Sequence, residues 1–352
     1  MSATKIAVRR IVLTAVKALG GFALLRFLTR DQVRILCYHG FSQDDEHKFR
    51  TKYFIRPTTF ERRLVILRRR GFKVITLDAL EHALKKKSLP NDCAVITIDD
   101  GMRSVLTYAA PILLRHKIPA TLYVTSYYVT HQVPISTFAA QYVLWTAHRR
   151  SLGSRFFVFR SLRLDLSTAQ GLSEATISTI RMFSQLVNEG LRQAALLELQ
   201  SCVLPEEPQL LNSGKFHLMS IKELESLSSY NIDVQLHTHR HTFPDNEAHC
   251  SKELLENQQA LSTINPKMRH FCFPSGEFKP HQLQWLENLG VATATTCENG
   301  LVNKKSNAFA LPRFLDGELV SDLDFEAEIC GISVIRNCVL AFMRKSPSVI
   351  LK

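Results

Sequence analysis

The run CAVITIDDG, residues 93–101, decides the fold class of this chain, because an apolar strand ends there in two adjacent carboxylates and a glycine. Neighbouring side chains of a strand point to opposite faces, so Asp99 and Asp100 can serve one site only where the strand ends and turns. Gly101 permits that turn, since glycine tolerates backbone angles that other residues avoid. An isolated Asp-Asp-Gly is also a common surface turn, so the interpretation depends on the rest of the chain.

Short apolar runs alternate with helical patterns along the sequence, which predicts a parallel α/β sheet, either barrel-like or doubly wound. A helix is expected after Thr59, because Phe60, Leu64 and Leu67 recur at helical spacing and Gly71 ends the pattern. The expected strands are residues 34–38, 73–76, 94–98, 120–125, 232–236, 270–273, 291–295 and 309–311.

Residues 131–215 break this rhythm, with basic and aromatic side chains followed by a helical stretch. We interpret them as an insertion or lid. The alternative is a pair of ordinary barrel helices.

A histidine-rich turn, residues 237–241, follows the expected strand 232–236. His237 and His241 are four residues apart and can face one ion if the chain coils after the strand. Asp100 would complete a set of two histidines and one carboxylate, which leaves positions open for water and substrate, as in a catalytic site. For His239 and His249, a solvated or supporting position is favoured over metal ligation.

Three more expected strands also stop in turns that carry polar groups. These turns are Tyr38-His39-Gly40, Pro274-Ser275-Gly276 and Pro312-Arg313. In barrels of parallel strands, catalytic groups gather at the carboxyl ends of the strands. Five such ends in one chain therefore predict a single site assembled from all of them.

Taken in order, these motifs resemble those of the polysaccharide deacetylases of the NodB-homology type, over roughly residues 33–314. The resemblance implies an α/β fold, a distorted (β/α) barrel, with Asp100, His237 and His241 as ligands of one divalent metal ion, for which zinc is favoured. It also implies that Asp99 is the catalytic base. The Tyr38-His39 placement is similar to the circularly rearranged branch, in which the N-terminal histidine, here His39, acts as general acid.

The activity implied by this resemblance is hydrolysis of the N-acetyl group of a sugar in a polysaccharide or a lipid-linked glycan. Ser275, Gly276 and Tyr38 are then expected beside the substrate and its oxyanion. Deformylation and chitooligosaccharide deacetylation are related alternatives, and a non-catalytic glycan-binding module is an alternative of another class. Nucleic-acid binding is not expected, because only the net charge of +12 favours it.

The chain departs from the commoner family pattern at two positions, with Cys272 in place of an arginine and Ser275 in place of an aromatic residue. We expect Arg313 to replace the missing arginine, because it follows the strand-like run 309–311 and should reach the end of the barrel that holds Asp99. Its guanidinium should then lie about 3 Å from that carboxylate. The alternative is a surface arginine after a proline turn.

Six positive charges precede Asp31, the first acidic residue, and apolar side chains are interleaved with them. Residues 1–30 are therefore interpreted as a membrane-associating segment, with the protein cytoplasmic and peripheral to the membrane. A helix packed on the domain and a signal peptide are the alternatives. The deacetylase barrel is expected over 31–315 and a helical C-terminal tail over 316–352. The scattered cysteines are typical of buried thiols in a reducing compartment.

Overall fold

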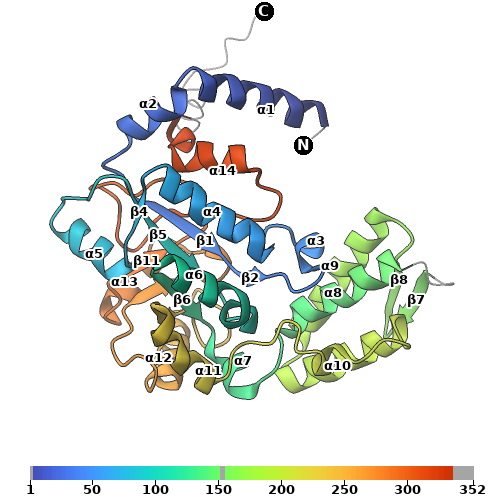
Figure 1. Cartoon of the computed structure of the whole chain (residues 1–352). Coiled ribbons are helices and arrows are strands. Elements are labelled where there is room, and N and C mark those ends of the chain that lie inside the picture. The colour runs from blue at the N-terminus through green and yellow to red at the C-terminus, as the bar shows by residue number, and fades with distance from the viewer. Residues whose placement is uncertain (1–2, 151–154, 336–352) are drawn as a thin grey trace, which may run out of the picture. The chain divides into compact units, whose positions relative to one another are not determined.

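The computed structural model describes residues 3–150 and 155–335 of the 352-residue chain (Figure 1). Its internal contacts separate Tyr128–Ser220 from the remainder as a second compact unit. The two units are therefore described one at a time.

The first unit is built on an eight-stranded sheet in which every strand pair is parallel. Strands that follow one another along the main path of the sheet are also neighbours in space, which is the order of a barrel and not of a doubly wound sheet. The main path runs through β11 (Thr293–Thr295), β10 (His270–Cys272), β9 (Ile232–Leu236), β6 (Ala120–Val124), β5 (Cys93–Ile98), β1 (Arg34–Tyr38) and β12 (Phe314–Leu315), and β4 (Lys73–Val74) pairs with β5.

The segment 311–315 joins the two edges of this sheet. Leu311 forms a parallel bridge with Thr295 of β11, and three residues later Phe314 pairs with Leu36 of β1. The predicted strand 309–311 is therefore wrong, since only Leu311 pairs and the strand proper begins at Phe314. Pro312, which has no N–H to donate, lies between the two pairings. Arg313 consequently lies on the stretch of chain that spans from one edge strand to the other.

Helices cover the outside of the sheet (Figure 1), and α4 (Pro57–Arg69) shows how the sequence specifies them. Phe60, Leu64 and Leu67 are buried along one face, as their spacing predicts. The helix begins before the predicted Thr59, because Pro57 fits the first helical turn. The other helices of this unit include α5 (Leu77–Lys85), α6 (Ala110–His116), α12 (Glu247–Leu261), α13 (Gln282–Asn288) and α14 (Asp322–Ile329).

The second unit, Tyr128–Ser220, contains the predicted insertion 131–215 and extends a few residues beyond it at both ends. Besides helices it holds an antiparallel hairpin that the sequence patterns did not predict. Phe183 and Leu196 are fully buried in this unit. Its elements are α8 (Ser136–Arg149), β7 (Phe156–Phe159), β8 (Leu162–Asp165), α9 (Ala169–Gln185) and α10 (Glu189–Val203).

Residues 3–30 contain two helices, α1 (Ala3–Ala18) and α2 (Gly21–Leu28), and α1 packs on α14 (Figure 1). No single described helix is long and apolar enough to cross a membrane. Taken together, α1 and α2 have sufficient length and hydropathy, but the pair is bent by 77°. Of the predicted helical tail 316–352, α14 is described and residues 336–352 lie outside the described residues.

Arg63 of α4 joins the strand β12 and helix α14 to the rest of the barrel. Its side chain is fully buried and its Nε donates to Asp316 at 2.9 Å, just after β12. It also pairs with Asp322, donates to the carbonyl of Val320, and lies 4.8 Å from the ring centroid of Phe325. The return of the chain to β1 thus depends on one buried guanidinium.

We expect Arg63→Ala to lower the free energy of unfolding by about 3–5 kcal/mol, because Asp316 would remain buried without its cation. Arg62→Ala is the matched control, since Arg62 is exposed and reaches Asp322 only at 3.4 Å. The control should change stability by less than about 1 kcal/mol. Denaturant unfolding of both variants measures the difference, and equal effects would contradict this role of Arg63.

Candidate active site

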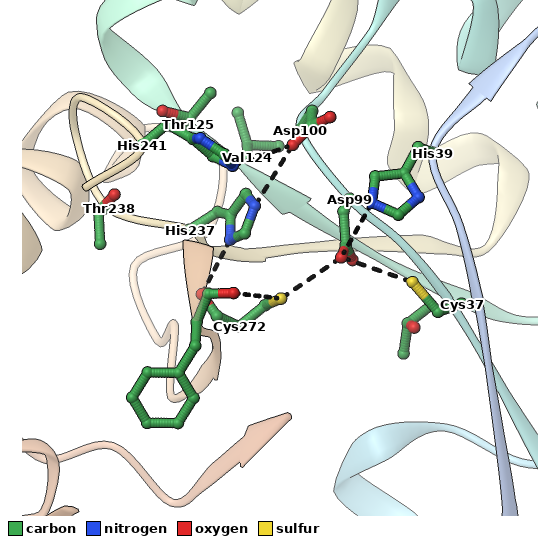
Figure 2. A network of polar contacts seen from close by, with 12 residues as sticks. Cys37, His39, Asp99, Asp100, Val124, Thr125, His237, Thr238, His241 and Cys272 are labelled. Atoms are coloured by element: carbon green, nitrogen blue, oxygen red, sulfur yellow. Dashed lines mark hydrogen bonds and ion pairs between the residues drawn. The ribbon is translucent and has the colours of Figure 1, made fainter. Parts of the chain in front are cut away.

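Polar side chains from five segments meet where the parallel strands of the barrel end. His39 follows β1, Asp99 and Asp100 follow β5, and His237 and His241 follow β9. Cys272 ends β10, and Arg313 lies just before β12. Figure 2 shows His237 and His241 turned toward Asp100, whereas His39, Cys37 and Cys272 are turned toward Asp99.

Left-handed backbone conformations divide the two neighbouring carboxylates between two sets of partners. Asp100 has φ 76° and Gly101 has φ 92°, so the chain turns immediately after Asp99. Thr238 and His241 also have positive φ, at 62° and 57°. Such angles cost non-glycine residues of the order of 1 kcal/mol or more each and are typical of functional sites. The sequence pattern gave reason to expect the turn at Gly101 but not these strained residues.

The side chains of Asp100, His237 and His241 form a compact ligand set. Oδ1 of Asp100 lies 3.4 Å from Nε2 of His237 and 3.5 Å from Nε2 of His241. Zinc bonds of about 2.0–2.2 Å place tetrahedral ligand atoms roughly 3.4 Å apart, so these separations fit a zinc-sized ion. The side chain of His241 is 27% exposed, which leaves access from solvent.

Hydrogen bonds behind His237 fix its orientation. Its Nδ1 lies 2.8 Å from the backbone carbonyl of Cys272, which leaves Nε2 directed at Asp100. Its backbone N–H donates to Oδ1 of the fully buried Asn257, and Nδ2 of Asn257 donates to the carbonyl of Val124. Such outer contacts set the tautomer and orientation of a metal-binding imidazole.

Asn257 was not among the residues predicted from the sequence. The buried residues of α12 are Cys250, Glu253, Leu254, Asn257 and Leu261, so Asn257 is the one amide on this face. A buried amide indicates a hydrogen-bonding role.

The other two histidines considered as ligands lie elsewhere. The Nδ1 of His239 lies 2.9 Å from the hydroxyl of Ser126, and its ring packs edge-on against Tyr127. His249 is exposed in the first turn of α12. Neither belongs to a group of described residues that can hold an ion.

Arg313 binds Asp99 through two parallel hydrogen bonds. NH1 donates to Oδ1 at 2.7 Å and NH2 donates to Oδ2 at 2.8 Å, within the reach expected from the sequence. Arg313 is fully buried, and its Nε donates to the carbonyl of Thr296. Burial by itself would raise the pKa of Asp99, but the Arg313 guanidinium outweighs it and holds that pKa well below its usual range.

Two thiols complete the surroundings of Asp99. Cys37 and Cys272 donate to Oδ2 over 3.5 and 3.4 Å, and NH2 of Arg313 reaches the sulfur of Cys272 at 3.1 Å. Burial raises the pKa of the Cys37 thiol well above its usual range, so Cys37 stays protonated and able to donate. Buried thiols were expected among the cysteines, but their contact with the carboxylate was not.

His39 lies on the other side of Asp99. Its Nε2 is 3.7 Å from Oδ2 of Asp99, and its ring packs against Tyr53. Its Nδ1 is buried and has no hydrogen-bond partner within the described ranges. One ring nitrogen of His39 therefore faces the carboxylate, and the other is enclosed by the protein.

Tyr38 does not contribute a side chain to the site, contrary to the sequence-based expectation. It is buried on the opposite face of β1, where its hydroxyl donates to Asp316 and its ring packs against Phe60. The reason is the alternation of side chains along a strand, which directs Cys37 and His39 to the site and Tyr38 away from it.

The turn after β10 only partly matches the expected oxyanion site. The N–H of Gly276 donates to the carbonyl of Phe273, so it is engaged within the turn. Gly276 is required because its φ is 71° and a Cβ there would approach Cys297 to 2.5 Å. Ser275 is exposed with φ 58°, which projects it from the turn. Gly276 thus shapes the loop, and of the two expected residues only Ser275 is exposed.

Charge decides which of the possible ligand groups fits a metal ion. Two alternative groups include Asp99, and an ion there would meet the guanidinium of Arg313. A third, Asp78, Glu81 and His270, has Glu81 paired with Arg269 and Lys85. Around Asp100, burial and then the charge of His237 lower the pKa of His241 to about 4. Burial lowers the pKa of His237 as well, but Cys272 and Asp100 outweigh it and hold that pKa well above its usual range, so a bound ion would take the place of a proton on His237.

No protein-family model and no curated protein sequence matches the chain. Solved structures do match it. The deacetylase PplD of Streptococcus pyogenes, solved with acetate, is 14% identical at a TM-score of 0.56, over 85% of this chain and 98% of that one. A polysaccharide deacetylase from Bacillus cereus is 15% identical at a TM-score of 0.52, and the match covers 85% of this chain and 69% of that one.

A de-N-acetylase from Aggregatibacter actinomycetemcomitans is 11% identical at a TM-score of 0.52, over 85% of this chain and all of that one. Identities this low establish the fold alone. The distorted (β/α) barrel that the motif order predicted is therefore confirmed, and the chain has the fold of the polysaccharide deacetylases.

Proposed function

We propose that this protein is a metal-dependent hydrolase that removes the N-acetyl group from a sugar in a polysaccharide or a lipid-linked glycan. One observation carries the proposal: the ligand set Asp100, His237 and His241 lies beside a second carboxylate, Asp99, and an imidazole, His39. The solved relatives, described as deacetylases, support the same chemistry.

A divalent ion held by Asp100 and the two histidines, with zinc favoured, would polarise the acetyl carbonyl and supply a water of lowered pKa. Each residue around it has a distinct task. Asp100 and the neutral imidazoles provide the ligands, and Asp99 accepts the proton of the attacking water. His39 gives a proton to the departing amine, so the products are acetate and a free amine.

The environment of Asp99 suits a base that takes a proton from an acidified water. Arg313 and two thiols hold both oxygens of Asp99, which fixes their direction but lowers their proton affinity. A weak base is effective only toward an acidic donor, so Asp99 and the proposed ion depend on each other.

His39 is placed to exchange a proton with the substrate amine. Its Nε2 faces the site, 3.7 Å from Oδ2 of Asp99, and is the atom that we assign to the amine.

The exposed Ser275 is assigned to the substrate side of the site, where a small hydroxyl replaces the bulkier aromatic residue of the commoner pattern. A non-catalytic glycan-binding module is the competing function. It requires neither an ionised Asp99 held in place nor His39 beside it. Incubation with a panel of N-acetylated oligosaccharides, followed by mass spectrometry for free amine and acetate, tests the proposal and separates deacetylation from deformylation.

We expect His241→Ala to abolish binding of a stoichiometric divalent ion, because it removes one of three ligands. His239→Ala is the matched control, since His239 lies on the same turn but contacts Ser126 and Tyr127. Elemental analysis after dialysis against zinc measures both variants. Equal loss of metal in both would contradict the ligand assignment.

Asp99→Asn should reduce turnover by at least about a hundredfold while metal content stays unchanged, because the amide cannot accept the proton. His39→Gln should act similarly, since glutamine cannot supply a proton to the amine. Acetate release and metal content are measured on the same samples. Full turnover in either variant would remove that residue from the mechanism.

Arg313→Lys should lower kcat by about tenfold or more without loss of metal, because a single ammonium cannot form both hydrogen bonds to Asp99. Arg103→Lys is a suitable control, since Arg103 is partly exposed and pairs with Glu223 rather than with Asp99. Because KM reports mainly substrate binding, it should change little. A lysine variant with full kcat would show that Arg313 is only structural.

A further inference from the structure

The first two helices leave large apolar side chains exposed, whereas an ordinary surface helix turns its apolar face to the core. In α1, Arg9 and Lys17 pair with Asp324 and Glu326 of α14 at 2.6 and 2.5 Å, although their side chains stay 42% and 45% exposed. Between them only Leu13 is buried. The charged residues of α1 therefore attach it to the barrel.

The outward face of α1 carries no charge. At about 100° per residue, roughly 220° of the helix circumference lies between Arg10 and Lys5 without a charged residue. Ile11 on this face is 69% exposed, although it is among the most apolar of side chains. Val8, Val12 and, just after the helix, Leu19 are also large, apolar and exposed, and so is Ile6 on the side of α1 that carries the charges.

The second helix, α2, also leaves large apolar side chains exposed. Its Arg26 donates from Nε to Asp92 at 2.8 Å, while Phe22 and Leu25 are buried. Leu24 and Phe27 face outward and are 59% and 62% exposed. A soluble surface rarely leaves so many large apolar side chains together in water, and such a patch marks an interaction site.

Cations lie at the border of this apolar surface and identify its partner. Arg10 borders the uncharged arc of α1 and lines, with Arg69 of α4, a groove between α1, α4 and α14. Arg30, just after α2, is also exposed and lies over the ring of Phe27. An apolar face rimmed by arginines matches a bilayer whose acyl region lies below anionic headgroups.

We propose that α1 and α2 form a surface that lies on an anionic membrane, such as the cytoplasmic leaflet, with their outward apolar side chains inserted and Arg10, Arg30 and Arg69 at the headgroups. This inference is independent of the hydrolytic function. The ion pairs to α14 and Asp92 keep the helices on the barrel, so the barrel itself is held at the membrane.

The test compares two triple variants of the full-length chain that change net charge equally. Ile11→Glu, Leu24→Glu and Phe27→Glu place acids on the proposed surface. Leu114→Glu, Leu255→Glu and Leu319→Glu place them on other exposed apolar positions of the same unit. Co-sedimentation is measured with phosphatidylcholine vesicles that contain or lack phosphatidylglycerol.

We expect the wild type and the second variant to bind the anionic vesicles, and the first variant to bind at least about tenfold more weakly. Circular dichroism on both variants checks that they are folded. Equal binding by the two variants would overturn the proposal.

The proposal would also be overturned if the lipid-free wild type is a dimer and the first variant a monomer, since a second copy of the chain would then cover the surface. Retention of the protein on membranes after an alkaline carbonate wash would overturn the surface-lying arrangement in favour of a spanning one.

Discussion

The buried ion pair between Asp99 and Arg313 is the interaction on which the site depends. Both side chains are almost fully buried, and a buried charge is stable only when it is paired and hydrogen-bonded. The pair also links β5 to the segment 311–315, which connects the two edges of the sheet. The same contact therefore joins the closure of the barrel to the direction of the carboxylate that we propose as the base.

Sequence reasoning found most of the site because its residues follow apolar strands that end at one edge of a parallel sheet. The position of Arg313 could be inferred for the same reason. Tyr38 was misplaced because a motif was followed without applying the alternation of the strand on which it lies. Asn257 and the thiol contacts to Asp99 were missed because they depend on which helix and strand face each other, and spacing along one segment does not contain that information.

The strained residues explain why neither the turn geometry nor its cost could be predicted. Asp100, Thr238 and His241 adopt left-handed angles although none is glycine. Local preference would place these residues elsewhere, so tertiary contacts must hold them. The amide of Asn257, bonded to both the His237 turn and the end of β6, is one such contact. A local pattern shows where such a turn occurs, but the packing around it decides its shape.

Adjacent carboxylates with opposite surroundings give the site its charge balance. Arg313 neutralises Asp99, whereas Asp100 with two neutral imidazoles would only partly neutralise the divalent ion that we propose beside them. One net positive charge would then remain in a buried region, where electrostatic interactions are strong. In the proposed reaction the amide substrate is neutral, and negative charge develops on its oxygen. This distribution would favour the transition state over the ground state, which is the requirement for catalysis.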